Sequence, residues 1–149
     1  MSPDPDRFAR ALFDGMPDAI VYADDAGLIR VWNRGAVRIF GFSETEALGR
    51  SLDIIIPTGP RERHWHGYRE TMRTGQTRYG DGQILSVPAM RKDGTRISVE
   101  FTIVPFSDEN GRMTGICAIM RDATARFEEV RALRKQIAER ASGDPGATR

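Results

Sequence analysis

Apolar and polar residues alternate strictly in several short stretches of the chain, most clearly at residues 97–103. A period of two is typical of a β-strand with one buried and one solvent-exposed face. Residues 113–120 are instead almost continuously apolar, which indicates a central strand. Turn sequences rich in Asp, Asn and Gly separate these runs. Five strands are predicted, at residues 19–23, 28–32, 84–90, 97–103 and 113–120.

Between the second and third predicted strands, the sequence pattern is typical of helices. Residues 34–40 predict a short helix, and Ser43 with Glu46 three positions later forms a capping-box pattern for another. Residues 60–74 predict a longer helix with Gly75 just past its end. Two strands, several short helices and three further strands are typical of an α+β domain. We expect a five-stranded antiparallel sheet with its helices on one face.

Further helices are predicted at both ends of the chain. Residues 6–13 have the spacing of an amphipathic helix. Residues 125–140 carry a narrow apolar line, formed by Phe127, Val130, Leu133 and Ile137. This line spans barely two heptads, so it fits a dimer-forming or signalling helix and equally a helix folded back on its own domain. Three parts are expected: a flanking helix at 1–15, a domain at 16–122, and a helix with a disordered tail at 123–149.

Composition and charge exclude several classes of protein. The 149 residues include 22 basic and 21 acidic ones, a net charge of +1, which favours neither nucleic acid nor an anionic membrane surface as a partner. No apolar run approaches the roughly 20 residues of a membrane span, and the first residues lack a secretory pattern. A cytoplasmic protein or fragment is expected. Cys117 is the only cysteine, which excludes an internal disulfide, and we interpret it as a buried core thiol.

Both histidines lie in the predicted helix at residues 60–74, and helical geometry sends them to different faces. His64 is in line with Tyr68 and Met72, with Trp65 beside them, so its imidazole belongs to an apolar stripe. His66 instead shares a charged stripe, with Glu62, Arg69 and Arg73. His64 is therefore the candidate for chemistry, although an inward histidine is more often a hydrogen-bonded core residue. No nucleophile, base and orienting partner can be placed together, so we do not expect an enzyme.

Several local motifs together resemble the PAS domain family over residues 10–126. They are the opening hairpin with Trp32-Asn33, the turn Gly41-Phe42-Ser43 followed by Leu48-Gly49, the hairpin RKDG at 91–94, and the exit Arg121-Asp122-Ala123-Thr124. The resemblance implies a sensory domain that binds haem, a flavin, another small molecule, or nothing. A light-sensing flavin domain would need a cysteine on a helix, whereas Cys117 lies on the last predicted strand.

The segment 54–75 is most similar to haem-binding PAS sensors of the FixL and direct oxygen sensor type. His64 and Gly75 have the same mutual spacing as the haem ligand and the following turn in those proteins. The resemblance implies haem b with His64 as its axial ligand, a gas or redox signal, a homodimer formed through the flanking helices, and an output domain or kinase. The implied pocket walls are Trp65, Tyr68, Met72, Leu85, Phe101 and Ile103. Arg69 or Arg78 is a candidate partner for the haem propionates.

The chain departs from those sensors where they place a ligand-sensing arginine. Leu85 falls approximately at that position, and Gln83 could replace it only if the register shifts. Bound O2 would lose its charged partner, so CO, NO or a redox signal stays open. Gly67 also stands where those sensors have a tyrosine, three residues after the ligand. The alternative function is a ligand-free or flavin-binding (FAD) module for dimerisation or protein interaction.

Overall fold

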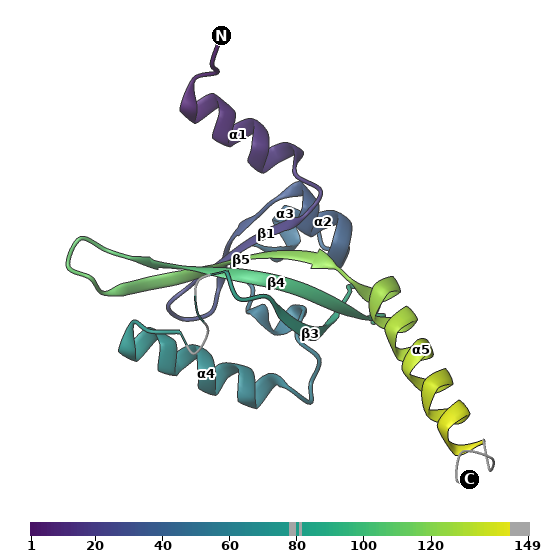
Figure 1. Cartoon of the computed structure of the whole chain (residues 1–149). Coiled ribbons are helices and arrows are strands. Elements are labelled where there is room, and N and C mark those ends of the chain that lie inside the picture. Colours follow the sequence, from purple (N-terminus) through teal and green to yellow (C-terminus); the bar gives the residue numbers. More distant parts are fainter. Residues whose placement is uncertain (78–79, 81, 144–149) are drawn as a thin grey trace.

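The computed structural model describes residues 1–77, 80 and 82–143. Five antiparallel strands form one sheet in the order β2-β1-β5-β4-β3 (Figure 1). The strands are β1 (Ala19–Asp24), β2 (Ile29–Trp32), β3 (Leu85–Met90), β4 (Arg96–Ser107) and β5 (Met113–Asp122). The helices are α1 (Pro5–Gly15), α2 (Arg34–Phe40), α3 (Glu44–Ala47), η1 (Leu52–Ile54), α4 (Arg61–Thr74) and α5 (Thr124–Ser142). The predicted α+β class and the five strands are confirmed.

The helix boundaries follow the local signals in the sequence. Ser43 and Glu46 form the predicted capping box, in which each side chain accepts a hydrogen bond from the other residue's backbone N–H. Helix α4 ends at Gly75, whose φ of 73° is in the left-handed region that glycine adopts without strain. Pro60 precedes this helix but provides no side-chain hydrogen bond to its first turn.

The register of the sheet places the predicted core residues on one face. Across β1, β5 and β4, Val21 is paired with Ala118, which is paired in turn with Ile103. A parallel row starts at Ala19 and ends at the sheet edge, through Met120, Phe101 and Leu85. Residues paired across strands share a face. Side chains of β1, β2, β3, β4 and β5 join those of α2, η1 and α4 in one hydrophobic cluster, so these helices cover the same face.

One corner of this core is closed by a buried polar residue. The Asn33 side chain, 2% exposed, accepts hydrogen bonds from Ile20 N at 2.8 Å and from Ala36 N at 3.0 Å. Its amide nitrogen donates to the carbonyl oxygens of Phe13 and Asp18. Asn33 therefore caps α2 and joins it to β1 and to the end of α1, which gives this corner a fixed geometry.

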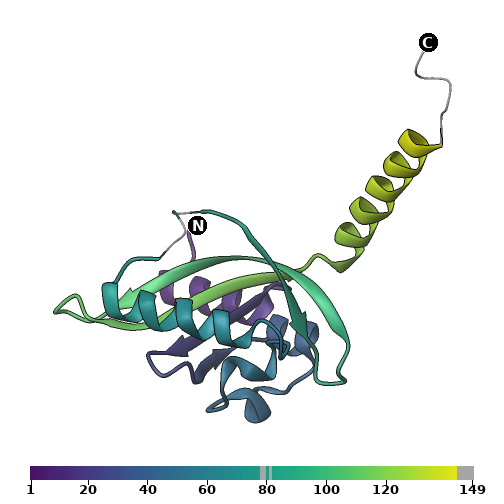
Figure 2. The ribbon, with the colours of Figure 1, turned by 90° about the horizontal axis from the view of Figure 1, so that it is seen from below.

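The flanking helices project from the sheet rather than packing on it (Figures 1 and 2). Neither α1 nor α5 contains a buried residue. The alternative in which the last helix folds back on its own domain is wrong, because its apolar line stays accessible, with Leu133 51% and Ile137 67% exposed. The disordered tail was expected at residues 142–149, of which residues 144–149 lie outside the described residues.

The interpretation of Cys117 as a core thiol is corrected by the same sheet register. Cys117 is paired with Tyr22 and Val104, on the face opposite the helices, and is only half-buried. Partial burial raises the pKa of its thiol. The continuous apolar run in β5 indicated two covered faces, but the outer face remains open, with Val104 and Phe106 nearly half exposed.

Candidate functional site

Helix α4 crosses the inner face of the sheet (Figure 2) and is anchored by Tyr68. The Tyr68 side chain is 8% exposed, and its hydroxyl donates to the carbonyl oxygens of Ala23 at 3.1 Å and Asp24 at 2.6 Å. This anchor fixes which face of the helix points inward. His64 is half-buried on that side and His66 is exposed, as the helical spacing predicted.

The imidazole of His64 is packed between two aromatic rings. Its centroid lies 4.8 Å from the Trp65 ring, which it meets edge-on, and 5.8 Å from the Tyr68 ring. The Nδ1 atom is buried and has no hydrogen-bond partner within the described part of the chain. Leaving a buried polar atom unpaired costs about 1–3 kcal/mol. Such an atom calls for an explanation, which can be a bound water, an ion or a functional role.

Burial and a nearby charge shift the pKa of this histidine in opposite directions. Desolvation lowers the pKa of His64 below its ordinary value, and the nearby Asp53 carboxylate opposes that effect more weakly. Burial thereby favours the neutral form of the ring. A neutral imidazole is the form that binds a metal.

Trp65 is held by contacts on both sides of its indole. Its Nε1–H donates to the Asp53 carboxylate at 2.7 Å. Its six-membered ring lies against Gly27, where an added Cβ would be 2.2 Å from two ring atoms. Sequence reasoning missed both contacts, because Asp53 and Gly27 belong to turns that only the fold brings to α4.

The sheet side of the predicted pocket is incompletely covered. Leu85, Phe101 and Ile103 lie on the inner face, as the alternation predicted, but all three are only half-buried. Met72, also predicted to line the pocket, is half-buried on α4. By contrast, the inner residues of β1 are at most 2% exposed. Apolar surface therefore remains accessible on the β3–β4 side of the inner face.

The predicted site residues fall into two groups. His64, Trp65 and Tyr68 contact one another on the β1 side, where Tyr68 reaches Ala23. The residues on β4 lie two strands from β1, roughly 10 Å away at the usual strand spacing. A ligand that touched both groups would have to be large and flat.

The register also decides between Leu85 and Gln83 as the inward residue near the sheet edge. Leu85 pairs with Phe101 and occupies the inner face. Gln83 is exposed, and its side-chain oxygen accepts a hydrogen bond from Gly80 N. Of the two arginines considered for the propionates, Arg69 is exposed on α4 and Arg78 lies outside the described residues.

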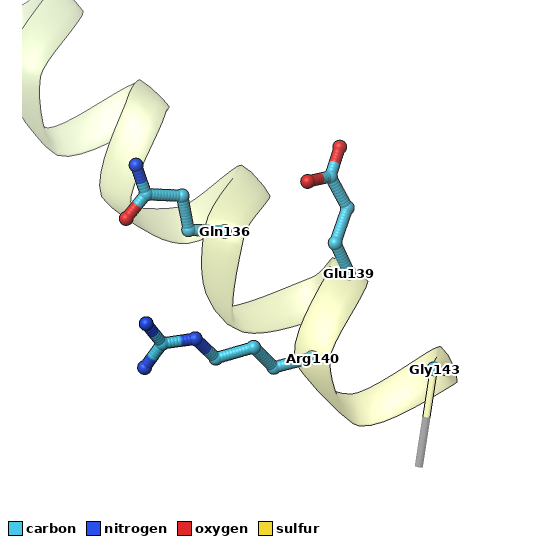
Figure 3. Close-up of a pocket in the computed structure, with 4 residues that line it drawn as sticks. All are labelled: Gln136, Glu139, Arg140 and Gly143. Carbon is cyan, nitrogen blue, oxygen red and sulfur yellow. The ribbon is translucent and has the colours of Figure 1, made fainter. Parts of the chain in front are cut away.

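One surface hollow adjoins some of these residues, and another lies at the end of α5. One of about 380 Å³ lies between α4 and the β1–β2 turn, lined by Asp25, Ala26, Ser51, Trp65, Tyr68 and Arg69. The other, about 600 Å³, is drawn in Figure 3 and is lined by Gln136, Glu139, Arg140 and Gly143 of the exposed end of α5. Because its lining comes from one projecting helix and lacks an opposite wall, we assign it no site.

The donor set of the described residues fits a haem better than a metal ion held by protein alone. Within residues 1–77, 80 and 82–143, no three His, Cys, Asp or Glu side chains gather as metal ligands. A haem needs only an axial ligand from the protein, because the porphyrin already holds its iron. The His64 ring, whose neutral form burial favours, and the half-buried apolar side chains farther along the inner face suit that role. No described helix is long and apolar enough to cross a bilayer.

Comparisons with known proteins agree on one family. The family model for the PAS fold matches residues 7–123. The sensor protein FixL of Bradyrhizobium diazoefficiens is 33% identical over 94 residues, which are 63% of this chain and 18% of that protein. The oxygen sensor protein DosP of Escherichia coli is 25% identical over 130 residues, 87% of this chain and 16% of that protein. The chain thus spans less than a fifth of these curated relatives.

A solved structure gives the same result for the fold. The crystal structure of a PAS domain from Colwellia psychrerythraea superimposes with a TM-score of 0.71 and 27% sequence identity. The match covers 82% of this chain and 99% of that one. Its extent confirms the five-stranded sheet and the helices on its inner face as the arrangement of that fold.

Proposed function

Because the chain belongs to the PAS family, we propose that it is a sensory domain that binds haem b through His64. In this proposal residues 16–122 form the sensory unit, and residues 1–15 and 123–149 flank it. The role is sensory rather than enzymatic, and its location is cytoplasmic.

The observation that carries the proposal is the unpaired, buried Nδ1 of His64. A histidine kept for packing alone would gain about 0.5–1.5 kcal/mol from a hydrogen bond to a backbone carbonyl. His64 instead has a depressed pKa and ring contacts only. Such a histidine is available as a ligand, and its unpaired nitrogen is available to a partner that orients the ring.

The accessible apolar surface on the β3–β4 side supports the same proposal. Phe101, Ile103 and Leu85 lie on the inner face of the sheet but are not sealed by protein atoms. Apolar surface left open in this way is stabilised when a flat, apolar group covers it, by roughly 25 cal/mol per Å². These residues would bind and orient the haem and exclude water from it.

The names of two relatives also support this function. One matching protein is called a sensor protein and another an oxygen sensor protein. When bound, haem iron with a histidine on one side can take a diatomic gas on the other. Leu85 on the inner face provides no charge or hydrogen bond, so we propose CO, NO or a redox change rather than selective O2 sensing.

We propose that the signal leaves the sheet through the connection to α5. Ser98 of β4 donates its N–H to the Thr124 hydroxyl at 3.0 Å and accepts from Ala123 N at 2.8 Å. Asp122 accepts from both the N–H and the hydroxyl of Thr124. A shift of β4 is thereby transmitted to the first turn of α5.

The proposal includes a homodimer formed through α1 and α5, linked to an output domain or kinase. Both helices expose apolar side chains, with Phe8 at 54% and Phe127 at 50%. A second copy of the chain would cover these stripes. Sedimentation of the haem-loaded chain should then give the mass of two chains, and a single-chain mass would reject the dimer.

A visible spectrum of protein loaded with haem tests the central assignment. Wild-type protein should show an intense Soret band, His64→Ala should lose it, and His66→Ala should keep it. His66 is the matched control, because it lies two residues away on the same helix but is exposed. The reverse pattern would reject His64 as the ligand.

The runner-up is a ligand-free or flavin-binding module that serves dimerisation. The exposed stripes on α1 and α5 fit this alternative as well as they fit the haem proposal. The same spectrum separates the two, since a flavin absorbs near 450 nm without a Soret band and an empty domain absorbs in neither region.

A further inference from the structure

Asp53 lies at the junction between a rigid turn and the helix that carries His64. The turn η1 is fixed by its buried neighbours Leu52 and Ile55, which are 8% and 5% exposed. The Ser51 hydroxyl accepts a hydrogen bond from Asp53 N at 3.1 Å. The backbone position of Asp53 is therefore determined by the core rather than by α4.

From this position Asp53 makes three connections to the first half of α4, one of them an ion pair in which its Oδ1 lies 3.9 Å from Arg61 Nε. Its carboxylate accepts from Trp65 Nε1 at 2.7 Å, and its carbonyl oxygen accepts from the Arg61 guanidinium at 3.1 Å. Arg61 also donates to Ile56 O at 2.9 Å. Because Pro60 gives α4 no side-chain cap, these connections restrain the first turn of the helix.

The orientation of the His64 ring depends on these connections. With Nδ1 unpaired, no hydrogen bond from that nitrogen restrains the imidazole, and its neighbours are the rings of Trp65 and Tyr68. Tyr68 is fixed independently by the carbonyls of β1. Trp65 is fixed at its indole nitrogen by Asp53. Rotation of Trp65 would open space beside His64 and release its ring.

We propose that Asp53 is a positioning residue, which holds Trp65 and, through it, the His64 ring in the orientation that haem ligation requires. This inference rests on the proposed function. Asp53 would act through Trp65 rather than on the haem itself. Loss of groups that orient a metal ligand typically weakens metal binding about 10- to 100-fold.

The first measurement uses haem-free protein and the two indole N–H signals in an NMR spectrum. Trp65 donates to Asp53, whereas Trp32 donates to the Phe42 carbonyl at 3.0 Å and is an internal control. Asp53→Ala should speed solvent exchange of the Trp65 indole proton about tenfold or more, since a hydrogen bond to a charged group contributes roughly 1.5–3 kcal/mol. The exchange rate of the Trp32 indole proton should not change.

The second measurement is the rate at which haem leaves the loaded protein, followed with an excess of a haem-scavenging protein. Asp53→Ala should raise this rate about tenfold or more. Asp53→Asn should restore much of the wild-type rate, because its side-chain oxygen still accepts from Trp65. Glu62→Ala, which removes an exposed carboxylate from the same helix, is the matched control and should change nothing.

The outcomes separate this inference from the proposed function. If wild-type protein binds no haem, the proposed function fails, whereas the indole signals still report whether Asp53 holds Trp65. If Asp53→Ala frees the indole but haem leaves at the wild-type rate, the positioning role is overturned and His64 ligation stands. Should Asp53→Ala not fold, Trp65→Phe removes the donor and keeps an aromatic ring. It should speed haem loss, and an unchanged rate would overturn the proposal.

Discussion

The two sides of the inner sheet face are packed to different degrees. On the β1–β2 side, Trp32 and Ile29 of β2 and Phe40 of α2 are at most 1% exposed. On the β3–β4 side, Ile97 and Val99 are also buried, but Leu85, Phe101 and Ile103, farther along the same face, are only half-buried. Both sides belong to one sheet and one continuous register. The difference therefore comes from the helices above the sheet and not from the strands.

Two buried polar groups also differ, in how fully they are hydrogen-bonded. The buried Asn33 on the packed side makes four hydrogen bonds, to Ile20, Ala36, Phe13 and Asp18. On α4 the Nδ1 of His64 is buried without any partner in the described residues. A satisfied polar residue stabilises a fixed structure, whereas an unsatisfied buried one calls for an explanation such as a ligand that completes the site.

The largest expected effect comes from truncating one phenylalanine on each side. Phe40→Ala should lower the free energy of unfolding by about 3–5 kcal/mol, because Phe40 is fully buried. Phe101→Ala in haem-free protein should lower it by less than about half as much, since Phe101 is already partly in water. Urea unfolding of both variants gives the comparison. Equal losses would mean that the β3–β4 side is as tightly packed as the other.

A smaller effect is expected when the unpaired histidine is replaced by an apolar residue. His64→Leu should leave haem-free protein as stable as wild type or more stable by up to about 1 kcal/mol, because it removes a buried, unsatisfied nitrogen. Tyr68→Phe on the same helix should instead destabilise by about 1 kcal/mol, since it deprives two carbonyls of their donor. Thermal unfolding measures both, and a clear loss of stability in His64→Leu would show that the ring is a structural residue.

The smallest effect concerns the ion pair between Glu46 of α3 and Lys92 in the turn between β3 and β4. Lys92 donates to Glu46 at 2.6 Å, and this hydrogen bond is the main cause that lowers the pKa of Glu46 from 4.5 to about 2. The depressed pKa means that the pair stabilises the fold fully above pH 4.5 and progressively less as the pH falls towards 2.

Glu46→Gln should consequently lose less stability than wild type between pH 4.5 and pH 2, as followed by urea midpoints. The difference should be small, because both side chains are exposed and salt screens the pair. Glu62→Gln provides a control on an exposed carboxylate without an ion pair among the described residues. If it behaves like Glu46→Gln, the Lys92 contact contributes nothing.

Local signals in the sequence were sufficient for most of the fold. The alternation at 97–103 predicted β4, Ser43 and Glu46 predicted the start of α3, and Gly75 predicted the end of α4. These features depend on residues a few positions apart, where backbone geometry fixes which side chains meet. The separation of His64 from His66 was confirmed for the same reason.

Features that depend on distant residues were not predictable in this way. Asp53 meets Trp65 only because η1 folds against the first half of α4, and neither residue type indicates such a pairing. Cys117 was misassigned because an apolar run does not reveal whether both faces of its strand are covered. Likewise, the sequence does not reveal whether another element covers the apolar line of α5, and this decides whether the helix packs on the domain or projects from it.

The sequence alone therefore determined the α+β class, the order of the elements, the family resemblance and the inward direction of His64, since each follows from short-range periodicity and local motifs. Only the tertiary structure decided that Nδ1 of this ring is unpaired, that Asp53 holds its neighbour Trp65, and that the β3–β4 side of the core is open. The physical reason is that burial and hydrogen-bond satisfaction are set by the atoms that surround a side chain, which in a folded chain come mostly from other segments.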